Sequence, residues 1–291
     1  MGRQRLLITG ADGMLGTELK RQAAERYELI PTDIGELDVA DREQVRRVVG
    51  AERPDLILHG GALTNVDLCE TEPDLAYRVN ALGTRNMAGA AADRGVPILY
   101  VSTDYVFGGD QQRPYLEFDP VAPRSVYGRS KLAGEVAAAE LSGGRFWIVR
   151  SQWIFGFGGK NFVDTILGAA REGRPLKVVD DQIGCPTWAR DLAAALLLIL
   201  DARPAYGIYH CSSKGSCSWF EFTRAILRAA GVEPASLQPI GSAELDRPAP
   251  RPAHSILRNY CLEQTLGDPM PDWQTALEAY LRAGGGSPNQ E

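Results

Sequence analysis

The sequence predicts an α/β fold, a doubly wound parallel sheet of Rossmann type with a smaller C-terminal substrate lobe. Short apolar runs alternate with helix-like segments through the first half of the 291-residue chain. Such runs are typical of parallel strands, which are buried on both faces and joined by crossover helices. A glycine-rich turn separates the first apolar run from the first helix, and the alternation changes after about residue 152.

Each apolar run of the first half is an expected strand, and these strands cover residues 5–9, 28–33, 55–60, 96–103 and 145–151. The expected helices cover residues 13–26, 41–51 and 73–95, and a fourth begins near Tyr127. All connections are short, which favours right-handed crossovers. The carboxyl ends of the strands should therefore open onto one crevice, where ligands bind in this kind of sheet.

The change of rhythm predicts a dinucleotide-binding domain over 1–151 and a mainly substrate-binding lobe over 152–282. Within the second part we expect 176–201 to return to the sheet layer as a strand and a helix. The segments expected in the smaller lobe are 207–213, a helix at 218–230 and the proline-rich 247–252. Residues 284–291 have no apolar side chain, so 283–291 is an expected disordered tail.

Composition excludes several classes of partner. The net charge of −6 provides no broad basic surface for nucleic acid. The longest aliphatic stretch, 192–200, is far shorter than the roughly 20 residues that span a bilayer, so we expect no membrane partner and a cytoplasmic location. Five cysteines without a Cys-x-x-Cys pair or a nearby histidine favour reduced thiols, with neither a disulfide framework nor a zinc site.

Gly10, Gly13 and Gly16 lie between the first strand and the first helix. Glycine permits the tight turn and the close approach of backbone to a pyrophosphate, and the helix N-terminus offers amide donors. The spacing is G-x-x-G-x-x-G.

Asp33 ends the second strand about 20 residues later, where a carboxylate can accept a ribose hydroxyl. These residues predict a site for NADH or NADPH; because Ile34 and Gly35 follow Asp33, a 2′-phosphate lacks an obvious partner and NADH is mildly favoured.

A second motif, SVYGRSKLAGE, places Tyr127 and Lys131 one helical turn apart on one face. Only five of the 31 basic residues are lysines, so chance yields few such pairs. Ser102, Thr103 and Asp104 lie at the end of the fourth strand and should therefore be at the same crevice. An ammonium beside a phenol lowers the phenol pKa and tunes it for proton transfer. The alternatives, a packed tyrosine, a strand-end cap and a turn-forming aspartate, stay open for each residue alone.

Together these motifs resemble the extended short-chain dehydrogenase/reductase superfamily and, within it, the dTDP-4-dehydrorhamnose reductase family. The resemblance runs along nearly the whole chain, through GALTNVDLCETEPDLAYRVNALGTRNMA (61–88), VSTDYVFGG (101–109), VYGRSKLAGE (126–135), RSQWIFG (150–156), NF (161–162), DQIGCPT (181–187) and RPAHSIL (251–257). It implies NAD(P)H-dependent reduction of the C4 keto group of a dTDP-linked 6-deoxy sugar to dTDP-L-rhamnose.

The resemblance also implies residue roles. Tyr127 would protonate the C4 oxygen, Lys131 would bind the nicotinamide ribose and lower the Tyr127 pKa, and Thr103 would hydrogen-bond the substrate carbonyl. The cofactor would be surrounded by Gly10, Gly13, Met14, Leu15, Gly16, Asp33, Asp38, Val39, Gly61, Ala62 and Leu63. The substrate would contact Asp104, Trp153, Asn161 and Arg251. A core tryptophan, a buried cap and a surface salt bridge are the alternative readings of the last three.

Some positions depart from the family pattern. Gln152 precedes the tryptophan where Ser is usual, Gly60-Gly61 replaces common alanines, and Cys185 occupies a position that is often small. These departures bear on which sugar is the substrate. A ketoreductase for another nucleotide-linked 4-keto-6-deoxy sugar is therefore an alternative function, as is a non-catalytic cofactor-binding regulatory subunit.

Some family members bind Mg²⁺ through acidic clusters at a subunit contact. We assign no metal ligand in this sequence, and a homodimer is left open.

Overall fold

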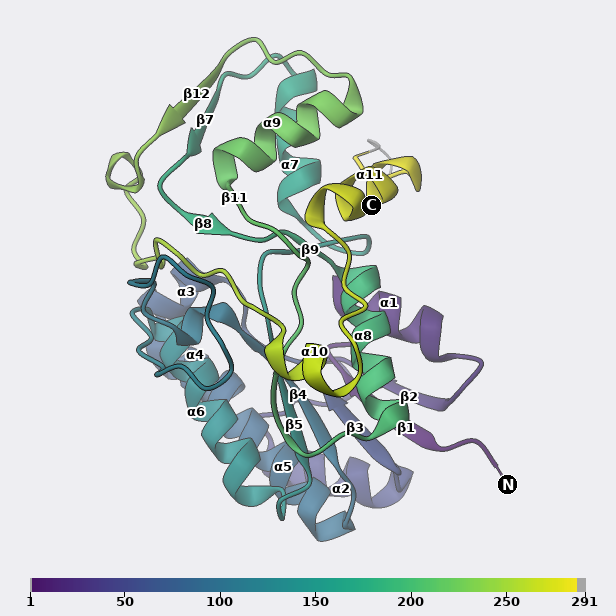
Figure 1. The fold of residues 1–291 in the computed structure, drawn as a ribbon. Helices are drawn as coiled ribbons and strands as arrows, with labels where there is room; N and C mark the ends of the chain where they lie inside the picture. Colours follow the sequence, from purple (N-terminus) through teal and green to yellow (C-terminus); the bar gives the residue numbers. More distant parts are fainter. Residues whose placement is uncertain (1, 287–291) are drawn as a thin grey trace.

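The computed structural model describes residues 2–286 and is built on one six-stranded parallel sheet (Figure 1). Its strand order is β10-β5-β4-β3-β1-β2. The strands are β1 (Arg5–Thr9), β2 (Glu28–Thr32), β3 (Leu56–His59), β4 (Ile98–Thr103), β5 (Phe146–Ser151) and β10 (Gly207–His210). Chain order reverses direction between β1 and β3, which makes that pair the topological switch point where ligands bind in such sheets.

Helices cover both faces of this sheet, and strand alternation explains why. Leu6 and Ile8 of β1 point into a core shared with α1 (Met14–Ala23) and α8 (Ala189–Ala202). Leu7 points the opposite way, into a core shared with α2 (Arg42–Glu52) and α5 (Thr84–Arg94). Side chains alternate between faces at each residue, so a continuous apolar run serves both cores. α6 (Val126–Leu141) packs beside α5 on the second face.

The helix expected over 73–95 is interrupted. It consists of α4 (Pro73–Tyr77), a π-helical segment (Arg78–Gly83) and α5, and it follows α3 (Val66–Thr71). α5 ends, as expected, at Gly95, which adopts φ +76°. π-helical turns are rare and occur frequently at functional sites. Here the π segment places the buried side chain of Asn80 toward α6.

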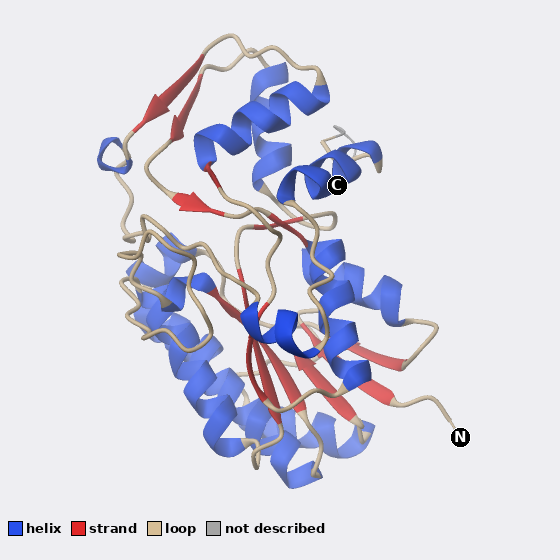
Figure 2. Cartoon of the chain, viewed as in Figure 1, coloured by secondary structure: helices blue, strands red, loops and turns tan. Residues whose placement is uncertain are grey.

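The small lobe lies at one end of the sheet (Figures 1 and 2). It contains the helices α7 (Phe162–Arg171), α9 (Trp219–Ala230) and α11 (Trp273–Arg282). Its short strands are β6 (Ile154–Phe155), β7 (Leu176–Val179), β8 (Ile183–Gly184), β9 (Thr187–Trp188), β11 (Cys217–Ser218) and β12 (Leu237–Ile240). Its core is aromatic, with Phe222, Trp188 and Tyr280 almost fully buried. The short helix α10 (Tyr260–Thr265) lies against β10.

Two strands lie elsewhere than predicted. The strand at 176–179 does not return to the main sheet; β7 pairs with β12 in the lobe. Its Lys177 is exposed, whereas a strand inside the main sheet would be covered on both faces. Conversely, residues 207–210 do not belong to the lobe, because β10 extends the main sheet beside β5. The helix expected within 176–201 does return to the sheet layer, because α8 packs against α1.

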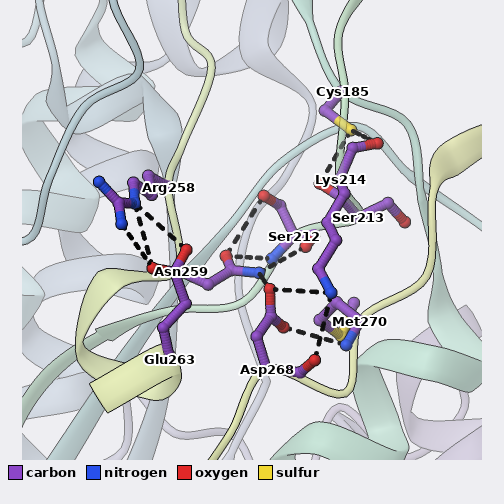
Figure 3. A network of polar contacts seen from close by, with 9 residues as sticks. All are labelled: Cys185, Ser212, Ser213, Lys214, Arg258, Asn259, Glu263, Asp268 and Met270. Carbon is purple, nitrogen blue, oxygen red and sulfur yellow. Dashed lines mark hydrogen bonds and ion pairs between the residues drawn. The ribbon is translucent and has the colours of Figure 1, made fainter.

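Polar side-chain contacts hold the segment after β10, in addition to its backbone bridge between Lys214 and Asp272 (Figure 3). The buried Asn259 accepts a hydrogen bond from the Ser212 amide at 3.0 Å and donates to the Ser212 carbonyl at 2.8 Å. It also donates to Asp268, which forms an ion pair with Lys214 at 3.6 Å. These contacts hold the crossing from the sheet to the lobe.

The predicted disorder is wrong for residues 283–286. Gly285 and Gly286 are buried, and the Gly286 amide donates to Asp164 Oδ1 at 2.9 Å. Small glycines fit there against Tyr280 and Leu167, which is a packing reason for a segment whose composition resembles a linker. Residues 287–291 lie outside the described part of the chain. Within residues 2–286, no helix is long and apolar enough to cross a membrane.

The glycine turn gives the first prediction. A Cβ on Gly16 would lie 2.3 Å from the Gly10 carbonyl oxygen, so Gly16→Ala should destabilise the protein by about 1–3 kcal/mol through overpacking. Gly89→Ala in α5 is the matched control, because a Cβ there meets nothing within 4 Å and alanine favours a helix by roughly 0.5–1 kcal/mol. Urea unfolding measures both; equal stability of the two variants would contradict the close approach.

Candidate active site

The glycine turn lies at the switch point between β1 and β3. Gly10 adopts φ +71°, and a Cβ there would lie 2.9 Å from the Gly61 amide nitrogen. Gly13 precedes α1 as its N-cap and provides no side-chain cap, so first-turn amides of α1 are available to an anion. Side chains at Gly10 and Gly16 would collide with neighbouring backbone, so the turn can be this tight only with glycine. A cradle of this kind, with free helix amides, fits the pyrophosphate of a dinucleotide.

The start of α1 also contacts the small lobe. Met14 and Leu15 are half-buried, with Leu15 packed on the sheet core and Met14 on the lobe core. A Cβ on Gly159 would lie 3.0 Å from Met14 Cγ. The glycine-rich segment 156–159 therefore passes over the helix end where the pyrophosphate is expected.

Asp33 is bound to the glycine turn. It accepts hydrogen bonds from the amides of Asp12 at 3.0 Å and Ile34 at 2.8 Å, and its own amide donates to Glu36 at 3.0 Å. Asp38 accepts from the Ala40 amide within the following turn. Val39 is buried and contacts the position of a Cβ on Gly83. Asp33 thus lies beside the cradle, and the contacts of Asp38 and Val39 shape the next loop.

The segment Gly61–Leu63 after β3 is held from two sides. The Gly61 amide donates to Thr9 Oγ1 at 3.0 Å. Asn80 accepts from the Leu63 amide at 2.8 Å, donates to the Leu63 carbonyl at 3.1 Å and donates to Ser130 Oγ at 3.0 Å. Ala62, between them, is half-buried. Sequence reasoning missed Asn80; an asparagine inside a long helix, where it disfavours helical structure, was the available signal.

The predicted catalytic groups come together at the end of β4. The Thr103 hydroxyl donates to Asp104 Oδ1 at 2.9 Å and accepts from the Tyr105 amide at 3.2 Å. Tyr127 is the second residue of α6, whose N-cap Ser125 accepts from the Gly128 amide. Its ring packs edge-on against Tyr105, and its phenol is close enough to Thr103 for that hydroxyl to affect the phenol pKa. Lys131, one turn along, is buried.

Burial shifts the pKa values of these groups. Burial raises the pKa of Tyr127, which a hydrogen bond with Thr103 opposes. Burial lowers the pKa of Lys131 to about 7. The Lys131 ammonium donates to the Val101 carbonyl at 2.8 Å and lies 4.2 Å from the centroid of the Tyr100 ring. Burial is the largest influence on the Tyr127 pKa here, and the expected lowering of that pKa by Lys131 stays a prediction. The phenol keeps its proton, as a general acid requires.

Asp104 shares this environment. Burial raises its pKa to about 6, while hydrogen bonds with Ser255 and Thr103 oppose the rise. A carboxyl that exchanges its proton near neutral pH, hydrogen-bonded to the Thr103 hydroxyl, can pass a proton along the Thr103–Tyr127 contact. The group of Thr103, Asp104 and Tyr127 is thus able to deliver a proton to an oxygen in the crevice.

On the lobe side, Trp153 stacks on Trp219 with ring centroids 3.6 Å apart and an angle of 8° between ring planes. Trp153 adopts φ +45°, a costly conformation for a bulky residue, and a Cβ on Gly184 would lie 2.4 Å from its ring. Both tryptophans line a cavity of about 330 Å³ with Lys160, Asn161 and Phe162. Sequence reasoning missed Trp219, Phe162 and Lys160, since nothing in the sequence places 160–162 opposite 219.

Two of the departures from the family pattern contact each other. The buried Gln152 accepts a hydrogen bond from the Cys185 amide at 3.1 Å through its side-chain oxygen. The Cys185 thiol in turn lies 3.0 Å from the Ser213 carbonyl oxygen. Both residues flank the Trp153–Gly184 contact in sequence. They form the support behind the tryptophan, so they bear on the shape of its pocket.

Comparison with known proteins agrees with this geometry. The family model described as "RmlD substrate binding domain" matches residues 4–284. The chain belongs to this family. It is 40% identical over 96% of its length to the spore coat polysaccharide biosynthesis protein SpsK of Bacillus subtilis, covering 97% of that protein. It is 37% identical to the dTDP-4-dehydrorhamnose reductase of Burkholderia thailandensis, covering 96% of this chain and 98% of that one.

A solved relative shows the same fold over the same length. The dTDP-4-dehydrorhamnose reductase of Bacillus anthracis, crystallised in complex with NADP, superposes with a TM-score of 0.93 at 40% identity. The match covers 97% of this chain and all of that one. The family membership and the extended short-chain dehydrogenase/reductase fold predicted from the motifs are thereby confirmed.

Two predicted substrate residues of the family pattern have structural partners. Asn161 is buried, caps α7 by accepting from the Asp164 amide and donates to the Gly156 carbonyl at 2.9 Å. Arg251 forms a two-pronged ion pair with Asp67 of α3, with distances of 2.7 and 2.8 Å. Arg251 thereby joins the 247–257 segment to the sheet domain near Tyr105.

Within residues 2–286, no group of three His, Cys, Asp or Glu side chains could hold a metal ion.

The Lys131 pKa gives a second prediction. The unfolded chain keeps this proton up to about 10.5, whereas the folded protein loses it at about 7. Between these values the unfolded state binds more protons, so this group makes the unfolding free energy rise with pH, by at most about 1.4 kcal/mol per unit. Urea unfolding of the wild type and Lys131→Met from about pH 7 to about pH 8.5 isolates the effect. Parallel curves would contradict the lowered pKa.

Proposed function

We propose that the protein reduces the C4 keto group of dTDP-4-dehydro-6-deoxy-L-mannose (dTDP-4-dehydrorhamnose) to dTDP-L-rhamnose with NADH or NADPH. The observation that carries the proposal is the meeting of Thr103, Tyr127 and Lys131 at the switch-point end of the sheet, next to the glycine cradle. Membership of a family that includes dTDP-4-dehydrorhamnose reductases supports the substrate class.

The cofactor would bind along the switch point. The turn from Gly10 to Gly16 and the start of α1 would hold the pyrophosphate. Asp33 would accept the adenosine ribose hydroxyl, and the segment Gly61–Leu63 would border the nicotinamide. When bound, the reduced nicotinamide supplies a hydride. The relative crystallised with NADP supports a nicotinamide dinucleotide without deciding between the two.

The chain's own groups handle the proton. Tyr127, protonated because burial raises its pKa, would donate its proton to the sugar C4 oxygen as charge develops there. Thr103 would hydrogen-bond that oxygen and its phenol neighbour, and Asp104 would supply the replacement proton. Lys131 would bind the nicotinamide ribose and place a positive charge near the developing oxyanion.

The lobe would hold the sugar and nucleotide. Trp153, with Trp219 behind it, provides a flat apolar surface that suits the apolar face of a deoxy sugar. Lys160 lies at the same cavity and offers a charge to the diphosphate. The nucleotide sugar is thus the expected small-molecule partner. Another nucleotide-linked 4-keto-6-deoxy sugar is the second candidate substrate, because a relative 38% identical to this chain is described as a probable dTDP-4,6-dihydroxy-2-methyloxan-3-one 4-ketoreductase.

The direct test is a spectrophotometric assay. Purified protein is mixed with enzymatically generated dTDP-4-dehydro-L-rhamnose and either NADH or NADPH, and reduced-cofactor absorbance and product are followed. We expect oxidation with dTDP-L-rhamnose as product. Tyr127→Phe should bind cofactor nearly normally while turnover falls by about 10²–10⁴-fold, the usual contribution of a general acid.

Other outcomes discriminate among the alternatives. Near-normal turnover by Tyr127→Phe would refute its assignment as proton donor. Oxidation only with a different 4-keto-6-deoxy sugar would support the second candidate. Tight cofactor binding without oxidation of any keto sugar would favour a regulatory subunit.

Asp33 tests the cofactor preference. Glu36 lies beside Asp33, and residues 2–286 show no ion pair to Asp33, so a 2′-phosphate there would face negative charge. We expect Asp33→Ala to weaken NADH binding more than NADPH binding, because the ribose acceptor and the repulsion vanish together. Dissociation constants from fluorescence titration measure this, with Glu43→Ala on the exposed face of α2 as the charge-matched control. Equal losses for both cofactors would argue against the ribose contact.

A further inference from the structure

A buried charge pair lies one helical turn beyond Lys131. Glu135 is 3% exposed and Arg150 is 2% exposed. Arg150 donates from Nε to Glu135 Oε1 at 2.9 Å and from Nη2 to Glu135 Oε2 at 2.7 Å. The Ser102 hydroxyl also donates to Glu135 Oε1, at 2.6 Å. Both carboxylate oxygens are therefore bound in a planar, two-pronged geometry.

These three residues come from the elements that carry the catalytic groups. Glu135 follows Lys131 by four residues on α6, on the same helical face. Ser102 directly precedes Thr103, and Arg150 lies opposite Ser102 in the β4–β5 register. One carboxylate therefore joins the helix of the proton donor to the strand of the substrate-binding hydroxyl.

Stability does not explain the pair. Removing two charges from water costs free energy that their attraction roughly repays, so apolar replacement of such a pair is often neutral or stabilising. Apolar residues already join the same elements nearby, where Ala138 of α6 packs with Tyr100 and Ile148. An apolar contact would thus have been sufficient to attach the helix.

The surroundings of Lys131 give the carboxylate a second effect. The titratable groups that interact with its ammonium are Glu135 on α6, Tyr100 on β4, Cys69 on α3 and His59 on β3. Tyr127 lies one turn earlier on α6. His59 is neutral, because burial lowers its pKa to about 3, and burial raises the pKa of Cys69 to about 11. Glu135 is the carboxylate among them, and it raises the pKa of Lys131 against the larger effect of burial.

We propose that Glu135 is a positioning residue for the reduction proposed above, on which this inference rests. Its carboxylate, bound by Arg150 and Ser102, fixes α6 over β4 and places a negative charge near the Lys131 ammonium, one helical turn after Tyr127. The effect reaches the reacting atoms through Lys131 and Thr103, not by contact with substrate.

The first test uses Glu135→Gln, which keeps the shape and an acceptor for Ser102 but removes the charge. The chain has only five lysines, so the pKa of Lys131 can be read from carbon-13 NMR of ε-labelled lysine, with the Lys131 signal assigned by its loss in Lys131→Met. We expect the Lys131 pKa to fall by about one unit. Turnover should fall about 10- to 100-fold, the scale of a displacement of roughly 1 Å. The pH at which activity declines on the alkaline side should fall by about the same one unit.

The second test separates positioning from folding. Glu135→Leu with Arg150→Met replaces the pair by apolar side chains and should retain a melting temperature near that of the wild type while turnover stays low. Tyr27→Phe is the control for lost stability away from the site, because it removes a part-buried phenol–carboxylate hydrogen bond to Asp201 of α8. That variant should lose stability but keep the Lys131 pKa and the activity profile.

Three results would overturn the proposal: an unchanged Lys131 pKa in Glu135→Gln, an unchanged alkaline limb, or wild-type turnover in the apolar double variant. Failure of the proposed reduction is a different result. In that case the wild type itself turns over no keto sugar, and the NMR titration, which needs no substrate, still decides whether Glu135 holds the charge on Lys131.

Discussion

The site depends on how closely α6 lies on β4. A Cβ on Gly134 would fall 2.5 Å from the Tyr100 hydroxyl and 2.6 Å from the Asn80 carbonyl oxygen, and one on Gly128 would fall 2.2 Å from the Tyr105 carbonyl oxygen. Backbone meets neighbouring side chains and backbone directly at both points. Any larger residue would lift the helix and carry Tyr127 and Lys131 away from Thr103. The distance between the Tyr127 phenol and the Thr103 hydroxyl is therefore set by two glycines.

This close packing also explains the unusual pKa values. The helix buries Lys131 and half-buries Tyr127, and removal from water disfavours the charged form of each. Neutral phenol and a weakly held lysine proton are the consequence, with Asp104 near its own transition. The arrangement suits a reduction, since a phenol must begin the reaction protonated. It also places two groups with a pKa near neutral, Lys131 and Asp104, around one crevice.

The sequence predicted those elements that depend on residues close together in the chain. The first five strands, their helices and the glycine turn follow from apolar runs and glycine chemistry, and they position Gly10, Thr103 and Tyr127. What the sequence could not show is long-range pairing. A four-residue run such as β10 or β7 does not specify its partner strand, so both were assigned to the wrong layer. The roles of Asn80 and Trp219 depend on contacts between segments that are distant in sequence. The burial of Gly285 and Gly286 likewise depends on their contacts with Tyr280 and Leu167.

Two parts of the site differ in how their geometry is maintained: the group of Thr103, Tyr127 and Lys131, and the region around Trp153. Thr103, Tyr127 and Lys131 come from a rigid sheet and its packed helix, so their geometry tolerates little change. Trp153, by contrast, adopts a costly left-handed conformation and is held by Gly184, by Trp219 and by the Gln152–Cys185 contact behind it. A conformation maintained by neighbouring side chains changes when those neighbours change. Because Gln152 and Cys185 are where this chain departs from the family pattern, the sugar preference is more open to variation here than the reaction itself.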